Sequence, residues 1–365
     1  MSKDFFRGKR VFVTGHTGFK GTWLSLMLTM KGAEVTGYAL EPAGSPDGSL
    51  FHLSGVERDM HSVIGDVRDI ACLQRTLDEA DPEIIFHLAA QPIVLESYQH
   101  PVETYTTNVM GTVNLLECAR KNGSVKCVVN VTTDKVYKNR EWVWGYRETD
   151  ELGGKDPYSN SKSCSELVTA SYRENFFLEK GVTVSTVRAG NVIGGGDMAP
   201  HRIIPDCIRA AFAGNPILVR NPFSIRPYQH VLEALMAYLM VCEAQYSDIS
   251  KAGSYNVGPD ETDCIATGEL AELFCGFWGE NLSWKSMEIE DTSKESRFLK
   301  LDSSKIRNDL GWRPRWDIRE AVGRTVEWAK IHRAGRNVRI CMENQIMNFC
   351  DTKTRYMQPI RDGYC

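Results

Sequence analysis

A glycine-rich turn between an apolar strand and a helical stretch constrains the fold of this chain more than any other feature. The segment Thr14–Gly21 has a G-x-x-G-x-x-G spacing, follows the apolar run Val11–Val13 and precedes the apolar-periodic stretch Thr22–Met30. The backbone there must bend tightly and let a pyrophosphate reach the amides at the helix N-terminus, where the helix dipole favours anions. With a second strand over Glu34–Leu40, this segment predicts a dinucleotide-binding βαβ unit; an ordinary turn is the alternative.

Apolar runs and helical stretches alternate through the first half of the chain. Further strands are expected at Ile84–Leu88, Cys127–Val131 and Val182–Arg188. This alternation predicts an α/β fold, a Rossmann-type doubly wound parallel sheet with helices on both faces and right-handed connections. The segment Glu41–Gly55, rich in Gly, Pro and Ser, is expected to be a surface loop.

The pattern changes after Gly190, where turn-rich and proline-broken segments replace the regular alternation. We expect a smaller, interleaved C-terminal substrate domain there, made of about 190–227 and 257–299, with a helix at Ile204–Ala213. Residues 1–189 and the returning segments about 228–256 and 300–328 form the nucleotide-binding domain in this interpretation. The tail 340–365 has no periodicity from which a structure can be predicted.

The composition disfavours several classes of protein. A formal net charge of −4 argues against binding to nucleic acid or to an anionic membrane, because both need a basic surface. The eleven cysteines include no C-x-x-C pair, so we expect no metal site, no disulfide framework and a reducing compartment. No apolar run is long enough to span a bilayer and no signal-peptide pattern precedes the first strand, so we expect a cytoplasmic protein.

The end of the second strand bears on the choice of cofactor. An acidic residue there binds the adenosine ribose of NAD, whereas NADP needs a basic partner for its extra phosphate. Glu41 is the candidate acid, and no Arg or Lys follows it before Arg58, which favours NAD. Lys20 in the glycine loop supports the opposite interpretation, as a partner of the NADP phosphate.

Two other strand ends carry candidate cofactor contacts. Asp66 follows a short apolar stretch, where it can accept a hydrogen bond from the adenine amino group; a solvated acid or a helix N-cap is the alternative. The segment His87–Gln91 ends a strand in small residues, which lets a cofactor lie close to the backbone. Close packing is the rival reason for these alanines.

The strongest group of candidate catalytic residues combines Tyr158 and Lys162 with Thr132–Lys135, which follows the strand Cys127–Val131. On a helix, Tyr158 and Lys162 are four residues apart and face the same way. An ammonium beside a phenol stabilises the phenolate, so that the tyrosine can exchange a proton with an alcohol near neutral pH. A Y-x-x-x-K pair often arises by chance, but its place behind a glycine loop and a Thr-Asp strand end indicates a catalytic site.

With these features the chain resembles the extended short-chain dehydrogenase/reductase family, from Lys9 to about Trp328. Its longer motifs are similar to those of the nucleotide-sugar 4,6-dehydratases of that family that act on CDP-hexoses. These motifs are Thr133–Lys135, Glu141–Glu148, Arg188–Asp197 and Arg226–Val231. Leu95 and Met198 depart from the pattern, which has an arginine and a tryptophan at those positions.

The resemblance implies NAD as the cofactor, a CDP-hexose as the substrate, and a homodimer or homotetramer that pairs through the helices bearing Leu115 and Tyr158. The implied catalytic residues are Thr133, Asp134, Lys135, Tyr158 and Lys162. The candidate cofactor contacts are Gly15, Thr17, Gly18, Phe19, Gly21, Glu41, Asp66, Val67, Leu88, Ala89, Ala90, Asn108, Thr132, Tyr158 and Lys162. The candidate substrate contacts are Gln91, Ser97, Asn191, Arg202, Arg226, His230 and Arg297. For Arg297, a surface ion pair with Glu295 is the alternative.

The resemblance also implies a reaction. Tyr158, hydrogen-bonded to Thr133, removes the proton of the sugar C4 hydroxyl while a hydride passes from C4 to NAD⁺. The resulting 4-ketone acidifies the C5 hydrogen, Asp134 protonates the departing C6 hydroxyl, and the hydride returns to C6. Lys135 stands where the related dTDP-glucose enzymes have a glutamate as the C5 base. It is either that base, in its neutral form, or a cation that anchors the substrate.

Two other functions are alternatives. A nucleotide-sugar 4-epimerase needs the tyrosine and the lysine but no acid to expel a C6 hydroxyl, so the pair Asp134-Lys135 disfavours it. A nicotinamide-binding regulatory protein that has lost the chemistry would not need Thr133, Asp134, Tyr158 and Lys162 together. The fold alone does not decide between these functions.

Overall fold

The computed structural model describes residues 4–42, 48–287 and 298–352. The strands are β1 (Arg10–Thr14), β2 (Glu34–Ala39), β3 (His61–Ile64), β4 (Ile84–His87), β5 (Cys127–Val131), β6 (Thr183–Ala189), β7 (Val192–Ile193), β8 (Ile217–Val219), β9 (Ile225–Pro227), β10 (Gln229–His230), β11 (Ser254–Val257), β12 (Cys264–Ala266) and β13 (Trp284–Ser286). The α-helices are α1 (Phe19–Met30), α2 (Leu50–Ser54), α3 (Ile70–Ala80), α4 (Val94–Gln99), α5 (Pro101–Tyr105), α6 (Gly111–Lys121), α7 (Pro157–Tyr172), α8 (Ile203–Ala213), α9 (Val231–Ser247), α10 (Thr267–Trp278), α11 (Ser304–Leu310), α12 (Ile318–Arg333) and α13 (Val338–Asp351). Short helical turns are η2 (Val56–Asp59), η3 (Thr106–Met110), η4 (Asp134–Val136), η5 (Arg173–Phe177), η6 (Leu178–Lys180), η7 (Ile249–Lys251) and η8 (Glu261–Asp263). None of the helices in these described ranges is long and apolar enough to cross a membrane.

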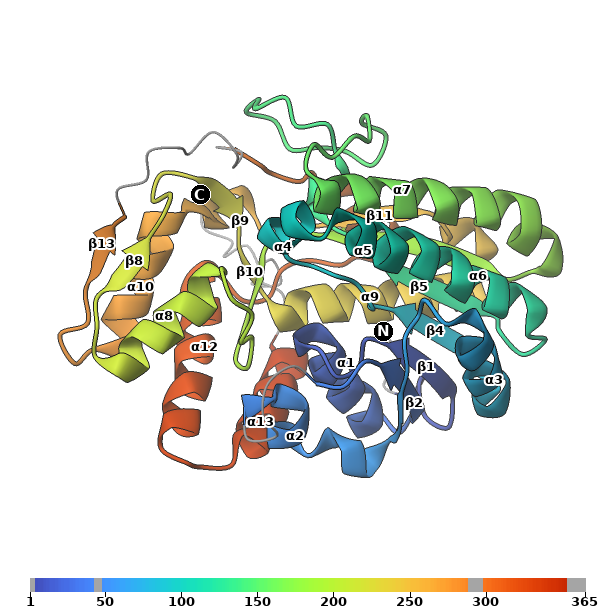
Figure 1. Cartoon of the computed structure of the whole chain (residues 1–365), viewed down its shortest axis with the longest axis horizontal. Coiled ribbons are helices and arrows are strands. Elements are labelled where there is room, and N and C mark those ends of the chain that lie inside the picture. Colours follow the sequence, from blue (N-terminus) through green and yellow to red (C-terminus); the bar gives the residue numbers. More distant parts are fainter. Residues whose placement is uncertain (1–3, 43–47, 288–297, 353–365) are drawn as a thin grey trace, which may run out of the picture.

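A parallel seven-stranded sheet forms the centre of the molecule, in the order β11-β6-β5-β4-β1-β2-β3 (Figure 1). Strand β1 pairs with β2 on one side and with β4 on the other, so Thr14 lies next to both Tyr38 and His87. The chain therefore reverses the direction in which it adds strands between β1 and β4. In open α/β sheets, ligands bind outside the carboxyl ends of the strands at such a point.

The predicted doubly wound α/β fold is confirmed by this sheet. Strand side chains alternate between its faces, so Val11 and Val13 belong to one apolar cluster and Phe12 to the other. The pattern missed the edge strand β11, because polar Ser254 and Asn256 interrupt its short apolar run.

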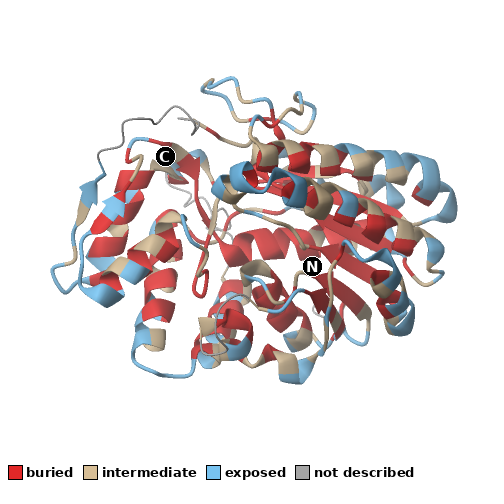
Figure 2. Cartoon of the chain, in the orientation of Figure 1, coloured by how far each residue is buried: buried red, intermediate tan, exposed pale blue. Residues whose placement is uncertain are grey.

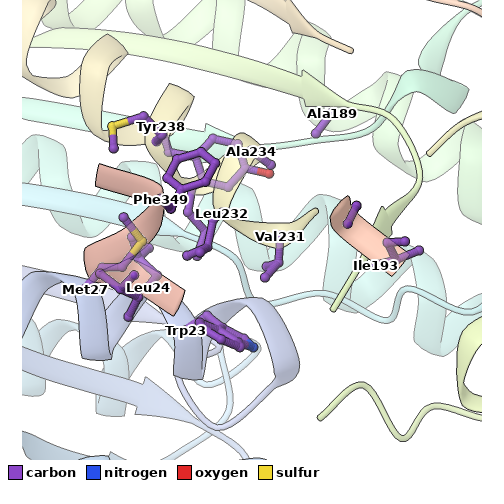
Figure 3. Packing of buried hydrophobic residues seen from close by; sticks show 14 of the residues in the cluster. Trp23, Leu24, Met27, Ala189, Ile193, Val231, Leu232, Ala234, Tyr238 and Phe349 are labelled. Carbon is purple, nitrogen blue, oxygen red and sulfur yellow. The ribbon is translucent and has the colours of Figure 1, made fainter. Parts of the chain in front are cut away.

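Two layers of helices cover the sheet, and the buried side chains gather where they meet it (Figures 1 and 2). Residues of α1, α9 and α13 form one cluster with the sheet, and residues of α3 and α6 form the other. Figure 3 shows Trp23 and Leu24 of α1 facing Leu232 of α9, with Phe349 of α13 beside them. The end of the chain thus completes the larger core.

The tail 340–365 was expected to have no predictable structure, but its first part belongs to α13. This helix buries Met342, Ile346 and Phe349 against the larger core, and Arg315 donates hydrogen bonds of 2.7 and 2.8 Å to the last carbonyls, those of Phe349 and Cys350. Polar residues between the apolar positions hide this periodicity in the sequence. The rest of the expected tail, from 353 onwards, lies outside the described residues.

The expected loop over Glu41–Gly55 also contains a helix, because α2 occupies Leu50–Ser54. Leu50 and Phe51 are buried and join the larger core, although Gly, Pro and Ser dominate the residues before them. Residues 43–47 of this segment lie outside the described ranges.

Smaller two-stranded sheets lie beside the main one, pairing β7 with β10, β9 with β12 and β8 with β13. Our division placed most of α12, up to Trp328, in the nucleotide-binding domain and the residues of α10 in the substrate domain. These two helices pack against each other (Figure 1), and Lys330 of α12 donates a hydrogen bond of 3.0 Å to the carbonyl of Phe277. The predicted division therefore cuts through a helix pair.

Three buried histidines should make the free energy of unfolding depend on pH. Burial lowers the pKa of His16 to about 4 and the pKa values of His87 and His230 to about 3. In the unfolded chain these groups take up protons near pH 6.5. Between pH 6.5 and about 4 the unfolded state therefore binds more protons, so the free energy of unfolding falls as the pH falls through this window. At pH 5 each histidine contributes a loss of about 2 kcal/mol.

Urea unfolding at pH 7 and pH 5 measures this loss. His230→Asn should make the pH dependence shallower, because asparagine can still cap α9, as the His230 ring does for the amide of Leu232. His100→Gln, at a largely exposed position, is the control and should leave the dependence unchanged. An unchanged slope in His230→Asn would contradict the assignment.

Candidate active site

The glycine loop lies directly against the carboxyl end of β4. Gly15 has a φ of +75°, and a Cβ atom on it would come 2.8 Å from the amide nitrogen of Ala89. A Cβ atom on Gly21 would collide with the carbonyl oxygen of Gly15, while Gly18 is the N-cap of α1. The loop is therefore packed so closely that side chains at Gly15 and Gly21 would collide with the backbone, and its own backbone lies at the start of α1, where a pyrophosphate can approach.

The ends of β2 and β3 meet the same loop. Thr17 Oγ1 donates a hydrogen bond of 2.9 Å to the carbonyl of Leu40, and His16 Nε2 is 2.7 Å from Ser62 Oγ. Glu41 is exposed just beyond β2, next to the residue that Thr17 contacts. The loop thus brings Glu41 to the region where an acid is expected to bind a ribose, and this role stays a prediction.

Asp66 is engaged with a neighbour in its own turn. Its carboxylate accepts hydrogen bonds from the amide and the guanidinium of Arg68, at 2.8 Å and at 2.5–3.0 Å, and these bonds lower its pKa. The N-cap of α3 is Asp69, which accepts bonds from the amides of Ala71 and Cys72. The N-cap alternative for Asp66 is therefore wrong, and contact with adenine remains a prediction.

The segment after β4 is held by hydrogen bonds to side chains of β1 and of the helical segment α5–η3. Thr14 Oγ1 accepts a bond of 3.2 Å from the amide of Ala89. Asn108 accepts a bond from the amide of Gln91 and donates to its carbonyl, at 2.8 and 3.0 Å. The side-chain amide of Gln91 bonds Thr104. Asn108 and Gln91 therefore support this segment in the structure, whatever they contact in a complex.

The candidate catalytic residues meet at the carboxyl end of β5. Thr133 begins the turn η4, and Tyr158 and Lys162 project from α7, which starts with the N-cap Asp156 and Pro157. Thr133 lies close enough to Tyr158 to lower the pKa of its hydroxyl group. The Lys162 ammonium donates a hydrogen bond of 3.2 Å to the carbonyl of Val131. The predicted group of residues is therefore brought together by one strand end and one helix.

Burial controls the ionisation of these two residues. It raises the pKa of Tyr158 to about 12, while the hydrogen bond from Thr133 and the positive charge of Arg202 act in the opposite direction. Burial lowers the pKa of Lys162 to about 8. In this state Tyr158 is a phenol, so a phenolate requires further positive charge near its hydroxyl.

Asp134 and Lys135 form a pair beside them. Asp134 is fully buried, and its Oδ1 lies 3.0 Å from Thr133 Oγ1 and 3.1 Å from Lys135 Nζ. Its Oδ2 has no hydrogen-bond partner among the described residues. Lys135 Nζ also donates a bond of 3.2 Å to Asn191 Oδ1. This arrangement offers one carboxylate oxygen to a substrate group and keeps the other paired.

Lys20 faces the catalytic residues. Its Nζ lies 3.5 Å from the Tyr238 hydroxyl, and burial together with the charges of Arg202, Lys162 and Lys135 lowers its pKa to about 7. The end of β2, where an NADP phosphate would lie, is instead reached by Thr17. The interpretation of Lys20 as the NADP phosphate partner is therefore not supported by its position.

Only some of the predicted substrate contacts lie near the candidate catalytic residues. Asn191 lies at the site through its bond to Lys135, and Arg202 is paired with the buried Asp197 at 3.0 Å while its charge reaches Tyr158. Arg226 lies on β9 and is 8% exposed, and its Nη1 donates to its neighbour's carbonyl at 2.9 Å.

Two other predicted substrate contacts have different surroundings. The buried His230 ring caps α9 and packs edge to face against Trp23 and Trp316, so we assign it to the core instead of the site. Ser97 is also buried and donates to the carbonyl of Val94 in its own helix at 2.6 Å. Arg297 and Glu295 lie outside the described residues.

Sequence reasoning missed two acids that act on these groups. Asp197 holds Arg202, and its position in a glycine-rich motif gave no sign of that role. Glu166 lies four residues beyond Lys162 on α7 and is buried against Arg188, at 2.8 Å. The continuing spacing of four residues was the available signal for Glu166.

Comparisons with known proteins agree with one another. The family model described as GDP-mannose 4,6 dehydratase matches residues 12–325. The CDP-glucose 4,6-dehydratase of Salmonella typhimurium is 48% identical over 361 residues, which cover 97% of this chain and 100% of that protein. A dTDP-glucose 4,6-dehydratase of Xanthomonas campestris pv. campestris is 28% identical over 87% of this chain and 92% of that one.

A solved structure shows the same fold at similar divergence. DesIV, a dTDP-glucose 4,6-dehydratase of Streptomyces venezuelae solved with NAD bound, is similar with a TM-score of 0.77 and 26% identity. The similarity covers 89% of this chain and 98% of that one.

The glycine loop gives a stability prediction with a built-in control. Gly15→Ala forces a side chain into a positive-φ position and against the backbone of Ala89, and it should lower the free energy of unfolding by roughly 2–4 kcal/mol. At Gly18 a Cβ atom would come no closer than 3.4 Å to the Gly15 oxygen, so Gly18→Ala should lower it by less than about 1 kcal/mol. Urea unfolding measures both, and equal losses would contradict the close approach.

Proposed function

This chain belongs to the family described as GDP-mannose 4,6 dehydratase, and from that premise we propose that it converts CDP-D-glucose to CDP-4-keto-6-deoxy-D-glucose and water. The resemblance to the nucleotide-sugar dehydratases found in the motifs is thereby confirmed. The 48% identity to a CDP-glucose 4,6-dehydratase, over nearly the whole of both chains, supports CDP as the nucleotide. The reaction consists of oxidation at C4, elimination across C5 and C6, and reduction at C6.

The position of Asp134 carries the proposal. Its buried Oδ2 is left without a partner among the described residues, although Oδ1 is paired with Thr133 and Lys135. A buried carboxylate oxygen without a hydrogen-bond partner is unfavourable unless a ligand binds to it. A 4-epimerase has no step that uses an acid at this place, whereas a dehydratase must protonate the C6 hydroxyl as it leaves.

The glycine loop fits the pyrophosphate of a dinucleotide, because glycine at positions 15 and 21 lets the loop fold tightly against itself and the end of β4, at the start of α1, where the helix dipole favours an anion. Lys162 and Thr132 lie at the end of β5, where the predicted contacts would hold the other end of the cofactor. NAD bound there accepts a hydride from the sugar and returns it at a later step.

Oxidation needs a base for the C4 hydroxyl. Tyr158 takes this proton in our proposal, with Thr133 holding the phenolic oxygen and Lys162 and Arg202 adding positive charge. Positive charge stabilises the phenolate relative to the phenol. Tyr158 is 8% exposed, so bulk water competes little for its hydroxyl group.

Elimination needs a base for C5 and an acid for the C6 hydroxyl. The Nζ atom of Lys135 lies 3.1 Å from Oδ1 of Asp134, so both groups can act on neighbouring atoms of the sugar. In the proposal, Lys135 takes the proton from C5 and Asp134 donates a proton to the C6 hydroxyl as it leaves. Lys135 must be neutral to act in this way. The ion pair with Asp134 is therefore the resting form. Before elimination begins, the proton must pass from Lys135 to Asp134, which leaves a neutral amine to act as the base and a protonated carboxyl group to act as the acid.

The nucleotide and its two phosphates are proposed to bind the guanidinium groups of Arg202 and Arg226, whose forks fit phosphate oxygens. Asn191 lies beside Lys135 and would contact the sugar. We further propose a cytoplasmic homo-oligomer that pairs through α6 and α7. These helices expose apolar side chains, including Met110 just before α6 and Leu167 on α7.

Three variants separate the steps in a single turnover with NAD⁺ and CDP-glucose. Tyr158→Phe should block oxidation, lowering the rate roughly 10²–10⁴-fold and giving no reduced-nicotinamide absorbance. Asp134→Asn should still oxidise C4 but stall before loss of water, and so accumulate reduced nicotinamide and a sugar that keeps its C6 hydroxyl. Lys135→Met should stall at the same stage and fail to exchange the C5 hydrogen with deuterated solvent.

Mass analysis of the trapped sugar reads out each stage. Exchange at C5 at the parental rate in Lys135→Met would assign Lys135 the anchoring role. Formation of the C4 epimer by the parent protein, without loss of water, would replace the proposal with the 4-epimerase.

A second prediction concerns the cofactor. NAD should bind the apo-protein more tightly than NADP, because exposed Glu41 lies beyond β2 and would repel an added phosphate. Lys20→Met should not change the ratio of the two dissociation constants, since Lys20 faces the catalytic residues. Glu41→Gln is the matched change at the ribose end and should narrow the ratio. Fluorescence titration of the parent and both variants with NAD and NADP measures all six dissociation constants, and a ratio altered only by Lys20→Met would reverse the assignment.

A further inference from the structure

The face of α7 that carries Tyr158 and Lys162 continues to a third buried ionisable residue. Glu166 follows Lys162 at the same spacing of four residues, so the three side chains lie on one face of the helix. Glu166 is 3% exposed, and no step of the proposed reaction uses it. A carboxylate buried this deeply must be compensated by hydrogen bonds or by an opposite charge.

Both oxygens of this carboxylate are bonded to the carboxyl ends of the central strands. Oε1 accepts a hydrogen bond from Thr132 Oγ1, one residue before Thr133. Oε2 accepts bonds from Thr186 Oγ1 at 2.7 Å and from Arg188 Nη2 at 2.8 Å, both on β6. One side chain of α7 is therefore attached to the two strands that lead into the site.

Arg188 extends this connection to the turn behind Asp134 and Lys135. Its Nη1 donates a hydrogen bond of 2.7 Å to the hydroxyl of Tyr137, and the guanidinium lies 5.1 Å from the centre of that ring. Tyr137 directly follows η4. The ion pair thus contacts the segment that follows β5 at two places. Glu166 bonds Thr132 at its start, and Arg188 bonds Tyr137 at its far end.

We propose that Glu166 is a positioning residue of this active site. Its carboxylate is paired with Arg188 and fixes α7 against the ends of β5 and β6. The same carboxylate supplies the negative charge that keeps Lys162 an ammonium. The inference rests on the proposed function, because it gives Lys162 its role in that reaction. Glu166 touches neither substrate nor cofactor in this proposal, and it acts through Lys162 and Thr132.

The charges around Lys162 support this role. Burial lowers the pKa of Lys162 to about 8, and the charge of Glu166 acts against that effect. The other ionisable groups near this face are Lys20, His87, Asp134, Lys135, Arg188 and Arg202. His87 is neutral at physiological pH, since burial lowers its pKa to about 3. Cations therefore outnumber acids there, and the loss of one acid favours the neutral form of Lys162.

The pH dependence of kcat/KM for CDP-glucose tests the electrostatic part. The two limbs of this profile report the pKa values of Lys162 and Tyr158. Glu166→Gln keeps the shape of the side chain but removes its charge, so both limbs should move to lower pH, by about one unit. Arg188→Met removes the opposite charge and should move them to higher pH. The double variant should return the profile to the parental position.

Thr186→Val is the matched control. It removes one hydrogen bond to the same carboxylate without changing any charge, so it should lower the rate at most and leave the profile in place. Lower rates in all the variants, with every profile at the parental position, would overturn the proposal and leave Glu166 a merely structural role. If Glu166→Gln does not fold, the other two variants still decide the question. The profile should move to higher pH in Arg188→Met and return to the parental position in the double variant.

A measurement without turnover separates this inference from the proposed function. Parent protein that does not dehydrate CDP-glucose would refute the proposed function alone. An NMR titration of isotope-labelled lysine, with the Lys162 signal assigned by Lys162→Arg, should then still show a pKa near 8 in the parent. The pKa should be lower in Glu166→Gln, higher in Arg188→Met and near the parental value in the double variant. A pKa that does not respond to either charge would overturn the inference itself.

Discussion

The attachment of α7 to the carboxyl end of β5 determines where every proposed catalytic group lies. Lys162 donates to the carbonyl of Val131 at 3.2 Å, and Ser163 donates to the carbonyl of Val136 at 2.8 Å. One turn further, Asn130 donates to Ser165 at 3.0 Å. Buried polar side chains of this kind find their partners in only one register of helix against strand, so they specify the axial position of α7 more sharply than apolar packing does. Tyr158 and Thr133 meet because this register is fixed.

The same junction concentrates positive charge in a protein whose formal net charge is −4. Lys20, Lys135 and Lys162 approach from a helix N-terminus, a turn and a helix, while Asp134 is buried among them. Both proposed ligands carry two phosphates, so excess cations in the free site are neutralised on binding. In the free site, burial and then the charges of Arg202, Lys162 and Lys135 lower the pKa of Lys20 to about 7. The formal net charge led us to expect no nucleic-acid partner, but it could not reveal this local concentration of cations.

Features set by local chemistry were predictable from the sequence. Glycine spacing and apolar runs predicted the glycine loop and most central strands, and the spacing of Tyr158 and Lys162 predicted one helix that carries both residues, which is α7. Features set by long-range contacts were not. His230 lies in a motif that suggested substrate binding, but contacts with Trp23 and Trp316, far from it in sequence, place it in the core. The direction of Lys20 likewise depends on Tyr238, which comes from a distant helix.

The proposed reacting groups and the proposed nucleotide contact lie on different parts of the structure. The carboxyl end of β6 carries Arg188, which pairs with Glu166 behind the catalytic helix, and three residues later Asn191 bonds Lys135 in front of it. The reacting groups are thus fixed by β5, β6 and α7, all elements of the central sheet and its helices. Arg226 lies instead on β9, which pairs with β12 outside that sheet. A change of nucleotide can therefore be accommodated there without moving Asp134, which fits the occurrence of one fold among relatives named for CDP-glucose and dTDP-glucose.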